Sequence, residues 1–436
     1  SMELYSKRFY QLDRNERLRV LKEKASLSDE DINILINGSG IDFKIADSIV
    51  ENAVSFISLP LGIATNFIIN GKEYLIPMAI EEPSVIAAAS KGAKIARIRG
   101  GFKASADPSL MIGQVQVISV DDMQRAINDL LKHKDEILAL ANSKSSLASR
   151  GAGAKDLACK VIDTSRGKML IVELLVDVKD AMGANVVNTM CESIAGTIES
   201  ITKGKVLLRI LSNYATHRIA RASAIFAREE LGSDVIEGIL DAYEFAKADV
   251  YRCVTHNKGV MNGIIAVANA TMQDTRAIEA GAHAYACREG RYMPLTQWSK
   301  DENGDLIGYI ELPLAVGIVG GLTSMHPLAR VCFKILNVNS AQELACVMAS
   351  VGLAQNFSAL HALVKEGIQH GHMRLHARRI ALLAGAEGST IDLVAERLAM
   401  EGKVSVDNAR RILEELRHEQ ISNKNKNRMN GMNKPI

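Results

Sequence analysis

The sequence predicts an α+β protein in which a large, mainly helical domain is interrupted by a smaller domain. Over residues 112–213, patterns typical of the two kinds of element follow one another as strand, helix, strand, strand, helix, strand. From about residue 217 long helical patterns predominate. Because the flanking segments do not form a complete domain, we expect a small domain at 109–216 inserted in a large domain formed by 1–108 and 217–367.

The elements of the small domain follow from local patterns. "IGQVQVISV" alternates as a strand does, and "VDDMQRAINDLLKHKDEILALANS" has the period of a helix. "DLACKVIDTSRGKMLIVELLVDV" predicts two strands around a Ser-Arg-Gly turn. The helix "NVVNTMCESIAGTIESIT" and the strand "GKVLLRILSN" complete the order. This βαββαβ order is the split arrangement of ferredoxin-like domains.

The large domain is predicted to combine helices with two hairpins. The hairpins surround Asn70-Gly71 and Asn303-Gly304, since Asn-Gly favours a two-residue turn. Helices are expected at "EEPSVIAAASKGAKIARIRGG", "RIARASAIFAREEL", "SDVIEGILDAYEFAKADVYRCV", "QDTRAIEAGAHAYACREG", "SAQELACVMASVGLAQNFSALHALVKEGI" and "STIDLVAERLAM". The polar, low-complexity end at 421–436 is predicted to be a disordered tail.

The composition excludes several classes of function. A net charge of +2 on 436 residues gives no global field that would recruit nucleic acid or an anionic membrane. With 4% aromatic residues, a base-stacking surface is not expected either. We find no apolar run of the length of a membrane span, no signal-peptide core, and six cysteines without a CxxC pair. We therefore expect a cytoplasmic protein with reduced thiols.

Two loop-like stretches carry candidate functional residues. "THNKGVMNG", Thr255 to Gly263, surrounds one cation with turn-forming residues, and by itself Lys258 reads as a turn lysine. "DAMGAN", Asp180 to Asn185, lies between a strand and a helix. There Gly183 would let the backbone approach a ligand, and free N–H groups at the helix start favour an anion such as pyrophosphate. Spacing alone favours an ordinary strand–helix turn.

Other candidates also have ordinary explanations. His370, His372 and His376 lie close together, and the last two are spaced by four residues, which can place a metal site on one helix face. Without a neighbouring carboxylate or thiol, structural histidines or a single general acid are alternatives. A glutamate such as Glu82 at a helix start compensates the dipole, and Asp274 caps a helix.

Six segments taken together resemble one family. "EEPSVIAAA", "DAMGANVVNTM", "THNKGVMNGI", "QDTRAIEAGAHAYA", "GIVGGLTSMHPLA" and "GHMRLHARR" occur in the order seen in class II, bacterial-type 3-hydroxy-3-methylglutaryl-coenzyme A (HMG-CoA) reductases. The resemblance covers nearly the whole chain. It implies that the large domain binds the substrate, the small domain binds a dinucleotide, and residues 368–420 form a C-terminal helical flap. It also implies a homodimer with the active site at the interface, and leaves a further assembly of dimers open.

The resemblance implies a reversible reduction of the thioester to mevalonate and free coenzyme A, using NADPH or NADH and no metal. Lys258 would stabilise the oxyanion, with Asn257 and Gly259 making room around it. Glu82 would be the proton donor, with a pKa raised by burial, and Asp274 would lie between the two and couple their charges. His372 would protonate the departing thiolate.

The resemblance also implies binding residues. The substrate would contact Ser84, Asn213, Arg252 and Asn262. Arg252 suits the free carboxylate of the acyl group. The dinucleotide would contact Asp180, Met182, Gly183, Ala184, Asn185 and Asn188.

Three departures from the family pattern matter. Ser145, after Lys144, stands where members that prefer NADH carry an acid for the adenosine 2′-hydroxyl, which favours NADPH or dual use. The dimer segment reads "ENAVS", at 51–55, instead of Glu-Asn-Val-Ile-Gly. A basic residue that contacts coenzyme A in some relatives falls at Tyr10, with Arg8 close by.

Two rival functions remain open. One is a metal-dependent hydrolase built on His370, His372 and His376. The other is a protein that binds coenzyme A thioesters without turnover.

Overall fold

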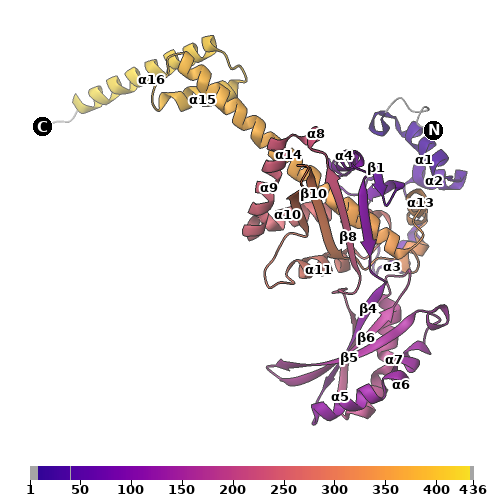
Figure 1. Ribbon diagram of the computed structural model, residues 1–436. Helices are drawn as coiled ribbons and strands as arrows, with labels where there is room; N and C mark the ends of the chain where they lie inside the picture. Colours follow the sequence, from indigo (N-terminus) through magenta and orange to yellow (C-terminus); the bar gives the residue numbers. More distant parts are fainter. Residues whose placement is uncertain (1–7, 40, 433–436) are drawn as a thin grey trace. The chain divides into compact units, whose positions relative to one another are not determined.

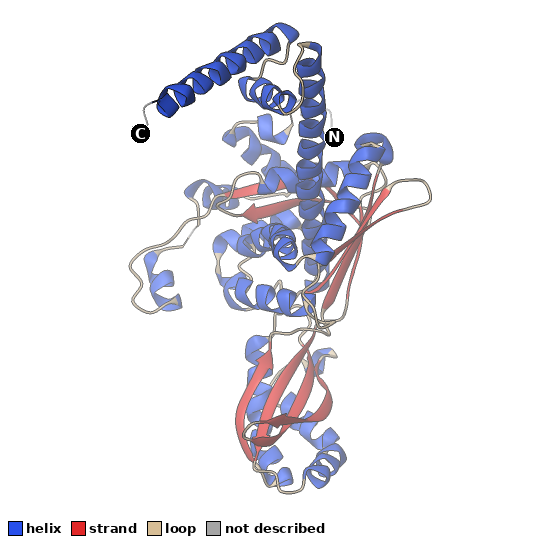
Figure 2. Cartoon of the chain, turned by 90° about the vertical axis from the view of Figure 1, so that its left-hand side faces the viewer, coloured by secondary structure: helices blue, strands red, loops and turns tan. Residues whose placement is uncertain are grey.

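The computed structural model describes residues 8–39 and 41–432 (Figure 1). The chain divides into two compact units, Ser1–Leu360 and His361–Ile436. The first unit contains two separate sheets, whose strands are red in Figure 2. One sheet belongs to the large domain and the other to the inserted domain, as the α+β prediction requires.

The large domain is built on a six-stranded sheet with the order β2-β1-β3-β8-β10-β9. The strands are β1 (Leu61–Ile69), β2 (Lys72–Ala79), β3 (Phe102–Ala106), β8 (Ile219–Phe226), β9 (Thr296–Lys300) and β10 (Leu306–Pro313). Both predicted hairpins are confirmed. Asn70 and Gly71 have φ values of 52° and 80°, as a two-residue hairpin turn requires, and β9 pairs with β10 across the loop that contains Gly304.

The prediction of a helix at residues 218–231 is wrong over most of its length. Residues Ile219–Phe226 form β8, a central strand that pairs with β3 on one side and β10 on the other. The alanines of this stretch favour a helix locally, but pairing along both edges and alternate burial decide for a strand. Only the short α8 (Arg228–Leu231) follows it.

Helices surround this sheet. Helix α4 packs on β1, α10 on β2 and α11 on β10, so the segments that carry the candidate residues meet at the sheet. Besides α8, the helices of the large domain are η2 (Phe9–Gln11), α1 (Arg14–Lys24), α2 (Asp29–Asn37), α3 (Phe43–Ile49), α4 (Val85–Arg97), α9 (Ser233–Ala248), α10 (Val250–Ala270), α11 (Thr275–Ala286), α12 (Gly321–Met325) and α13 (Pro327–Leu336).

The inserted domain has the predicted ferredoxin-like topology. Its antiparallel sheet has the order β5-β6-β4-β7, from β4 (Leu110–Ile118), β5 (Gly153–Thr164), β6 (Gly167–Asp177) and β7 (Lys205–Ser212). Its helices are α5 (Met123–Lys132), α6 (Lys134–Asn142) and α7 (Ala184–Thr202), with the short η3 (Ala148–Arg150). The single helix predicted after β4 is broken at His133, which ends α5 and precedes α6.

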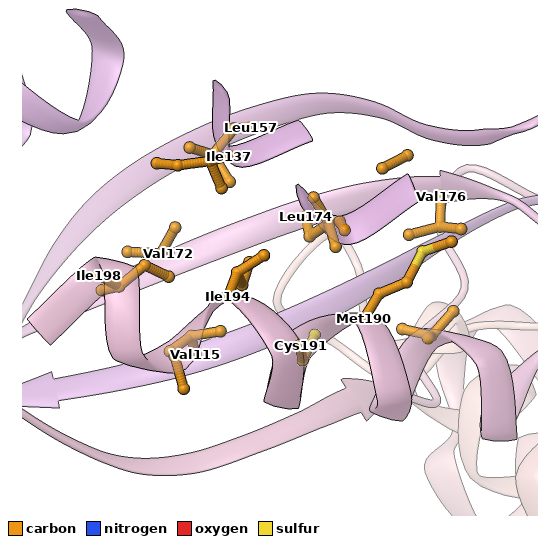
Figure 3. Close-up of a cluster of buried hydrophobic side chains, with 14 of the residues drawn as sticks. Val115, Ile137, Leu157, Val172, Leu174, Val176, Met190, Cys191, Ile194 and Ile198 are labelled. Carbon is orange, nitrogen blue, oxygen red and sulfur yellow. The ribbon is translucent and has the colours of Figure 1, made fainter. Parts of the chain in front are cut away.

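The core of the inserted domain lies between its sheet and α7. Apolar residues from alternate positions of the strands meet one face of that helix (Figure 3). Met190, Ile194 and Ile198 of α7 are fully buried against strand residues such as Val172 and Leu174. The helix start, which follows the "DAMGAN" stretch, is therefore held by packing along the whole of α7.

The second unit is helical, as predicted for the C-terminal part. Helix α14 (Ala341–Leu383) runs across the boundary between the units, and α15 (Thr390–Glu401) and α16 (Val406–Met432) follow. Disorder predicted from residue 421 is not found over 421–432, where α16 continues. Its first turns are buried through Ile412 and Leu413, and an established helix gains one hydrogen bond for each residue added. Residues 433–436 lie outside the described chain.

Helix α14 corrects one expectation about apolar runs. Of the described helices it alone has the length and apolar composition to cross a membrane, with a mean hydropathy of 1.3 over an 18-residue stretch. However, 78% of that stretch is buried inside the protein, as expected for a core helix.

Candidate active site

Lys258 lies on a helix, not in a turn. The whole stretch Thr255–Gly263 is part of α10, so the turn interpretation is wrong. Asn257 explains why: its buried side chain donates to Met293 O at 3.0 Å and accepts from Leu295 N at 2.9 Å. Asn257 therefore fixes α10 against the segment before β9. A Cβ at Gly259 would meet no atom within 4 Å.

The structure brings Lys258 together with Glu82. The lysine Nζ lies 3.3 Å from both carboxylate oxygens, although 176 residues separate the two in sequence. Glu82 follows β2 and precedes α4, and packing of α10 on β2 makes the meeting possible. The lysine side chain is 60% exposed and the glutamate 41%. The expected burial of Glu82 is therefore wrong for this single chain.

Asp274 has other partners in this chain. It caps α11 by accepting from Ala277 N at 3.0 Å, and it pairs with Arg276 at 3.2 Å. Among the ion pairs of the described residues, none joins Asp274 to Lys258 or Glu82. The predicted coupling of the three charges stays a prediction.

The four expected substrate residues are spread over three elements. Asn262 lies one turn after Lys258 on α10, so the two share a helix face. Arg252 is in the first turn of the same helix and half-buried. Ser84 precedes α4 in a left-handed conformation with φ of 75°, and its side chain makes no cap hydrogen bond. Asn213 is exposed directly after β7.

A cavity of about 800 Å³ lies in the first unit. Met182, Gly183, Ala184 and Asn185 line it, and so does Asp274. The structure therefore brings four of the expected dinucleotide residues to the same cavity as one expected catalytic carboxylate. His326 also lines this cavity, and burial lowers its pKa.

Three expected dinucleotide residues do not line the cavity. The Asp180 carboxylate accepts from Ala341 N at 3.0 Å, and the Asn188 amide oxygen accepts from Leu211 N at 2.9 Å. Ser145 accepts from Leu147 N at 3.2 Å. Each of these side chains therefore accepts a hydrogen bond from a backbone N–H group.

The start of α7 is shaped for a ligand. Gly183 precedes the helix with φ of 96°, and a Cβ there would lie 2.5 Å from Val178 Cγ1. No side chain caps the helix, so N–H groups of its first turn have no intrahelical partner. Free N–H groups and the helix dipole favour an anion at this point, which suits the pyrophosphate of a dinucleotide.

Two further residues contact the loop at residues 180–185 or the segment paired with it, and no sequence pattern pointed to them as candidates. Gln273 precedes Asp274 and binds the backbone of Gly317, and Arg218 is buried beneath the loop. Burial lowers the pKa of Arg218 to about 10, opposed by the charges of Asp177 and Asp180. The glycine-rich motif "GIVGG" was the available signal for this neighbourhood, whereas nothing in the sequence marked Arg218.

His372 belongs to the second unit. It lies on α14 with His370 and His376, and all three side chains are exposed. Among the described residues, no three His, Cys, Asp or Glu side chains form a group that could hold a metal ion.

Comparison with known proteins gives consistent matches. A family model described as hydroxymethylglutaryl-coenzyme A reductase matches residues 13–377. A 3-hydroxy-3-methylglutaryl-coenzyme A reductase of Archaeoglobus fulgidus is 54% identical over 411 residues, which is 94% of each chain. A probable reductase of the same name from Borreliella burgdorferi is 36% identical over 440 residues and 98% of both chains. A solved class II reductase from Streptococcus pneumoniae, bound to NADPH in open conformations, has a TM-score of 0.82 at 42% identity. The alignment covers 93% of this chain and 100% of that one.

Proposed function

The chain belongs to the hydroxymethylglutaryl-coenzyme A reductase family, and from this premise we propose that it reduces HMG-CoA to mevalonate and free coenzyme A. The reaction consumes two molecules of NAD(P)H and two protons, and it is reversible. The observation that carries the proposal is the contact of Lys258 with Glu82 at 3.3 Å. This contact places a cation from "THNKGVMNGI" beside a proposed proton donor from "EEPSVIAAA".

Each residue of the pair has one task. A nicotinamide cofactor, when bound, supplies the hydrides. Lys258 stabilises the negative charge that develops on the carbonyl oxygen, and Glu82 delivers the proton to that oxygen. Asp274, which lines the cavity with the dinucleotide loop, tunes the charge of the pair when the site is complete.

The proposed roles of Lys258 and Glu82 require a cover over the two side chains. Charge stabilisation is strongest where water is excluded, and the two side chains are 60% and 41% exposed. We assign the cover to the helical segment 368–420 together with a second copy of the chain. In the closed state His372 of that segment protonates the departing coenzyme A thiolate.

The proposed substrate contacts lie near the face of α10 that carries Lys258. Asn262 shares a helix face with Lys258, and Ser84 lies two residues after Glu82, so both can reach an acyl group held at the pair. Arg252 binds the free carboxylate of that group, and Asn213 completes the set.

The dinucleotide binds at the cavity, with its pyrophosphate at the start of α7. The free N–H groups there and the close approach that Gly183 allows support this placement. Ser145 stands where an acid would repel the 2′-phosphate of NADPH, and the neighbouring Lys144 can attract that phosphate. The pair therefore favours NADPH or dual use. Asp180 and Asn188 act through the backbone that they hold.

We place the reaction in the cytoplasm and assign the protein as a homodimer. The six free cysteine thiols and the burial of the apolar stretch of α14 support the location. Exposed apolar side chains at residues 54–59 support association with a second copy.

The test follows the near-ultraviolet absorbance of NADH, then of NADPH, after addition of HMG-CoA. Absorbance should fall with wild type, and Lys258→Ala should lower kcat by about 10²–10³-fold, as loss of an oxyanion donor does. Lys300→Ala removes a surface lysine that pairs with Glu237 and serves as control. Normal turnover by Lys258→Ala would contradict the proposed role of Lys258.

The same experiment separates the non-catalytic alternative. A protein that binds coenzyme A thioesters without turnover would bind HMG-CoA in a calorimetric titration but would oxidise neither cofactor. Running the assay with mevalonate, coenzyme A and the oxidised cofactors tests reversibility.

A further inference from the structure

We infer that Gln273 and Arg218 are positioning residues that hold the dinucleotide loop, residues 180–185, in register with Asp274. They act through the segment 316–319, which lies between them. The inference rests on the proposed function, because it assigns the loop to the cofactor and Asp274 to the chemistry.

Gln273 makes two hydrogen bonds to one residue of this segment, Gly317. Its amide nitrogen donates to Gly317 O at 2.7 Å, and its amide oxygen accepts from Gly317 N at 3.0 Å. The side chain thus pairs with the glycine as a neighbouring strand would. Two parallel bonds fix both the distance and the orientation of Gly317.

The segment 316–319 is in turn paired with the dinucleotide loop. Ile318 N donates to Asp180 O at 2.8 Å, and Ala181 forms a parallel bridge with Val319. A Cβ at Gly317 would lie 2.5 Å from Met182 N, so only glycine permits this approach. Any shift of Gly317 is therefore transmitted to the loop by direct contact.

Arg218 binds the backbone of both the dinucleotide loop and the segment 316–319. Its guanidinium donates to Met182 O at 3.0 Å and to Val316 O at 2.6 Å, and the residue is only 4% exposed. A buried charge requires such partners, since leaving it unpaired is strongly unfavourable. The arginine therefore fixes the loop and the segment to one another at a single point.

The consequence concerns the distance between two functional groups. Met182 to Asn185 and Asp274 line the same cavity. Gln273 is the residue immediately before Asp274. A displacement of about 1 Å in a reacting geometry can lower a rate about 100-fold. Gln273 thus sets where the dinucleotide loop stands relative to the carboxylate.

The test uses Gln273 variants of the full-length protein, because loss of buried Arg218 risks the fold. Gln273→Glu keeps the acceptor for Gly317 N but sets a carboxylate against Gly317 O, and Gln273→Met removes both bonds at similar length. Gln124→Glu makes the same chemical change on the exposed face of α5, where Gln124 binds only Asn128. It serves as the matched control.

Three quantities are measured for each variant: the Kd of NADPH and NADH without thioester, the KM of HMG-CoA with kcat, and the melting temperature. Positioning predicts that both Gln273 variants raise the dinucleotide Kd about tenfold and lower kcat, a change of about 1.4 kcal/mol in binding. The KM of HMG-CoA should change less than twofold, and Gln124→Glu should match wild type.

Two results would overturn the inference. One is wild-type dinucleotide affinity and kcat in both Gln273 variants. The other is an equal loss of affinity for both ligands with a lower melting temperature, which indicates a merely structural role. A wild type that binds no dinucleotide would instead overturn the proposed function, so the two failures are distinguishable.

Discussion

At the residue scale, the site depends on an ion pair that adds little to stability. Lys258 and Glu82 are both more than a third exposed, and exposed pairs contribute about 0–1 kcal/mol. The residues that directly precede Lys258 and Asp274 in sequence make structural bonds instead: buried Asn257 holds α10, and half-buried Gln273 holds Gly317. The side chains with proposed catalytic roles are therefore accessible, whereas their neighbours in sequence hold the backbone.

We expect the preference between NADPH and NADH to depend on Ser145. Ser145→Asp introduces a carboxylate that repels a 2′-phosphate and accepts from a 2′-hydroxyl, so the ratio of kcat/KM for NADPH over NADH should fall about tenfold. The change suits the local fold, since an aspartate can also accept from Leu147 N. Steady-state kinetics with both cofactors measure the ratio. Ser146→Asp, at the exposed next position, is the control, and an unchanged ratio in Ser145→Asp would exclude this role.

At the element scale, the start of α7 requires a glycine for two reasons. Gly183 has φ of 96°, and a Cβ would lie 2.5 Å from Val178. Gly183→Ala should therefore lose about 1–3 kcal/mol of unfolding free energy and weaken dinucleotide binding.

Gly151→Ala separates the two reasons. Its φ of 77° is also unfavourable for alanine, but a Cβ there would meet no atom within 4 Å. Chemical denaturation should show a smaller loss for Gly151→Ala than for Gly183→Ala. Equal losses would mean that the contact with Val178 is relieved without cost.

Helix α10 contains a buried histidine that makes stability depend on pH. The His256 ring nitrogen Nε2 lies 2.7 Å from Thr296 Oγ1, and burial, aided by the charge of Arg252, lowers the pKa of His256 to about 3. The unfolded chain has the ordinary value of 6.5 and binds the proton first. The contribution of neutral His256 is therefore complete above about pH 6.5 and is lost progressively as the pH falls towards 3.

His256→Gln tests this pH dependence, because glutamine can still reach Thr296 and does not titrate. Between pH 7.5 and pH 5, the melting temperature of wild type should fall more than that of the variant. Differential scanning calorimetry over this range gives both profiles. Parallel profiles would show that proton uptake by His256 does not contribute.

At the scale of the whole molecule, an exposed apolar segment supports the proposed association of two copies of the chain. Val54, within the expected dimer segment 51–55, is 89% exposed, and Ile57, just after that segment, is 97% exposed. Phe56, Ile57 and Leu59 also line the cavity, so a second copy that covers this segment covers one cavity wall. A monomer should therefore lose both the contact and much of its activity.

Ile57→Asp should convert the proposed dimer to a monomer and lower turnover at least about tenfold, since a charge is unfavourable in an apolar interface. Sedimentation velocity measures the assembly, and the cofactor assay measures turnover. Ile162→Asp places the same charge on a partly exposed strand of the small domain and should leave the dimer intact. A dimeric, fully active Ile57→Asp would contradict this assignment.

Local patterns were sufficient for much of the fold. The strands and helices of the inserted domain and both Asn-Gly hairpins follow from periodicity and turn chemistry, which act over a few residues. The same rules failed at β8, whose alanines favour a helix, and at Thr255–Gly263, whose Asn and Gly residues favour a turn. In both places pairing or buried hydrogen bonds with distant segments outweighed local preference.

The sequence by itself determined the family, because six ordered motifs specify it and the comparisons confirm it. It also determined the βαββαβ topology of the inserted domain, including the connection at residues 180–183 that leads into α7. Only the tertiary structure decided which side chains meet. The contact of Lys258 with Glu82 spans 176 residues, and that of Arg218 with Val316 spans 98. Such contacts arise from the packing of whole elements, whereas periodicity and spacing report only on neighbours along the chain.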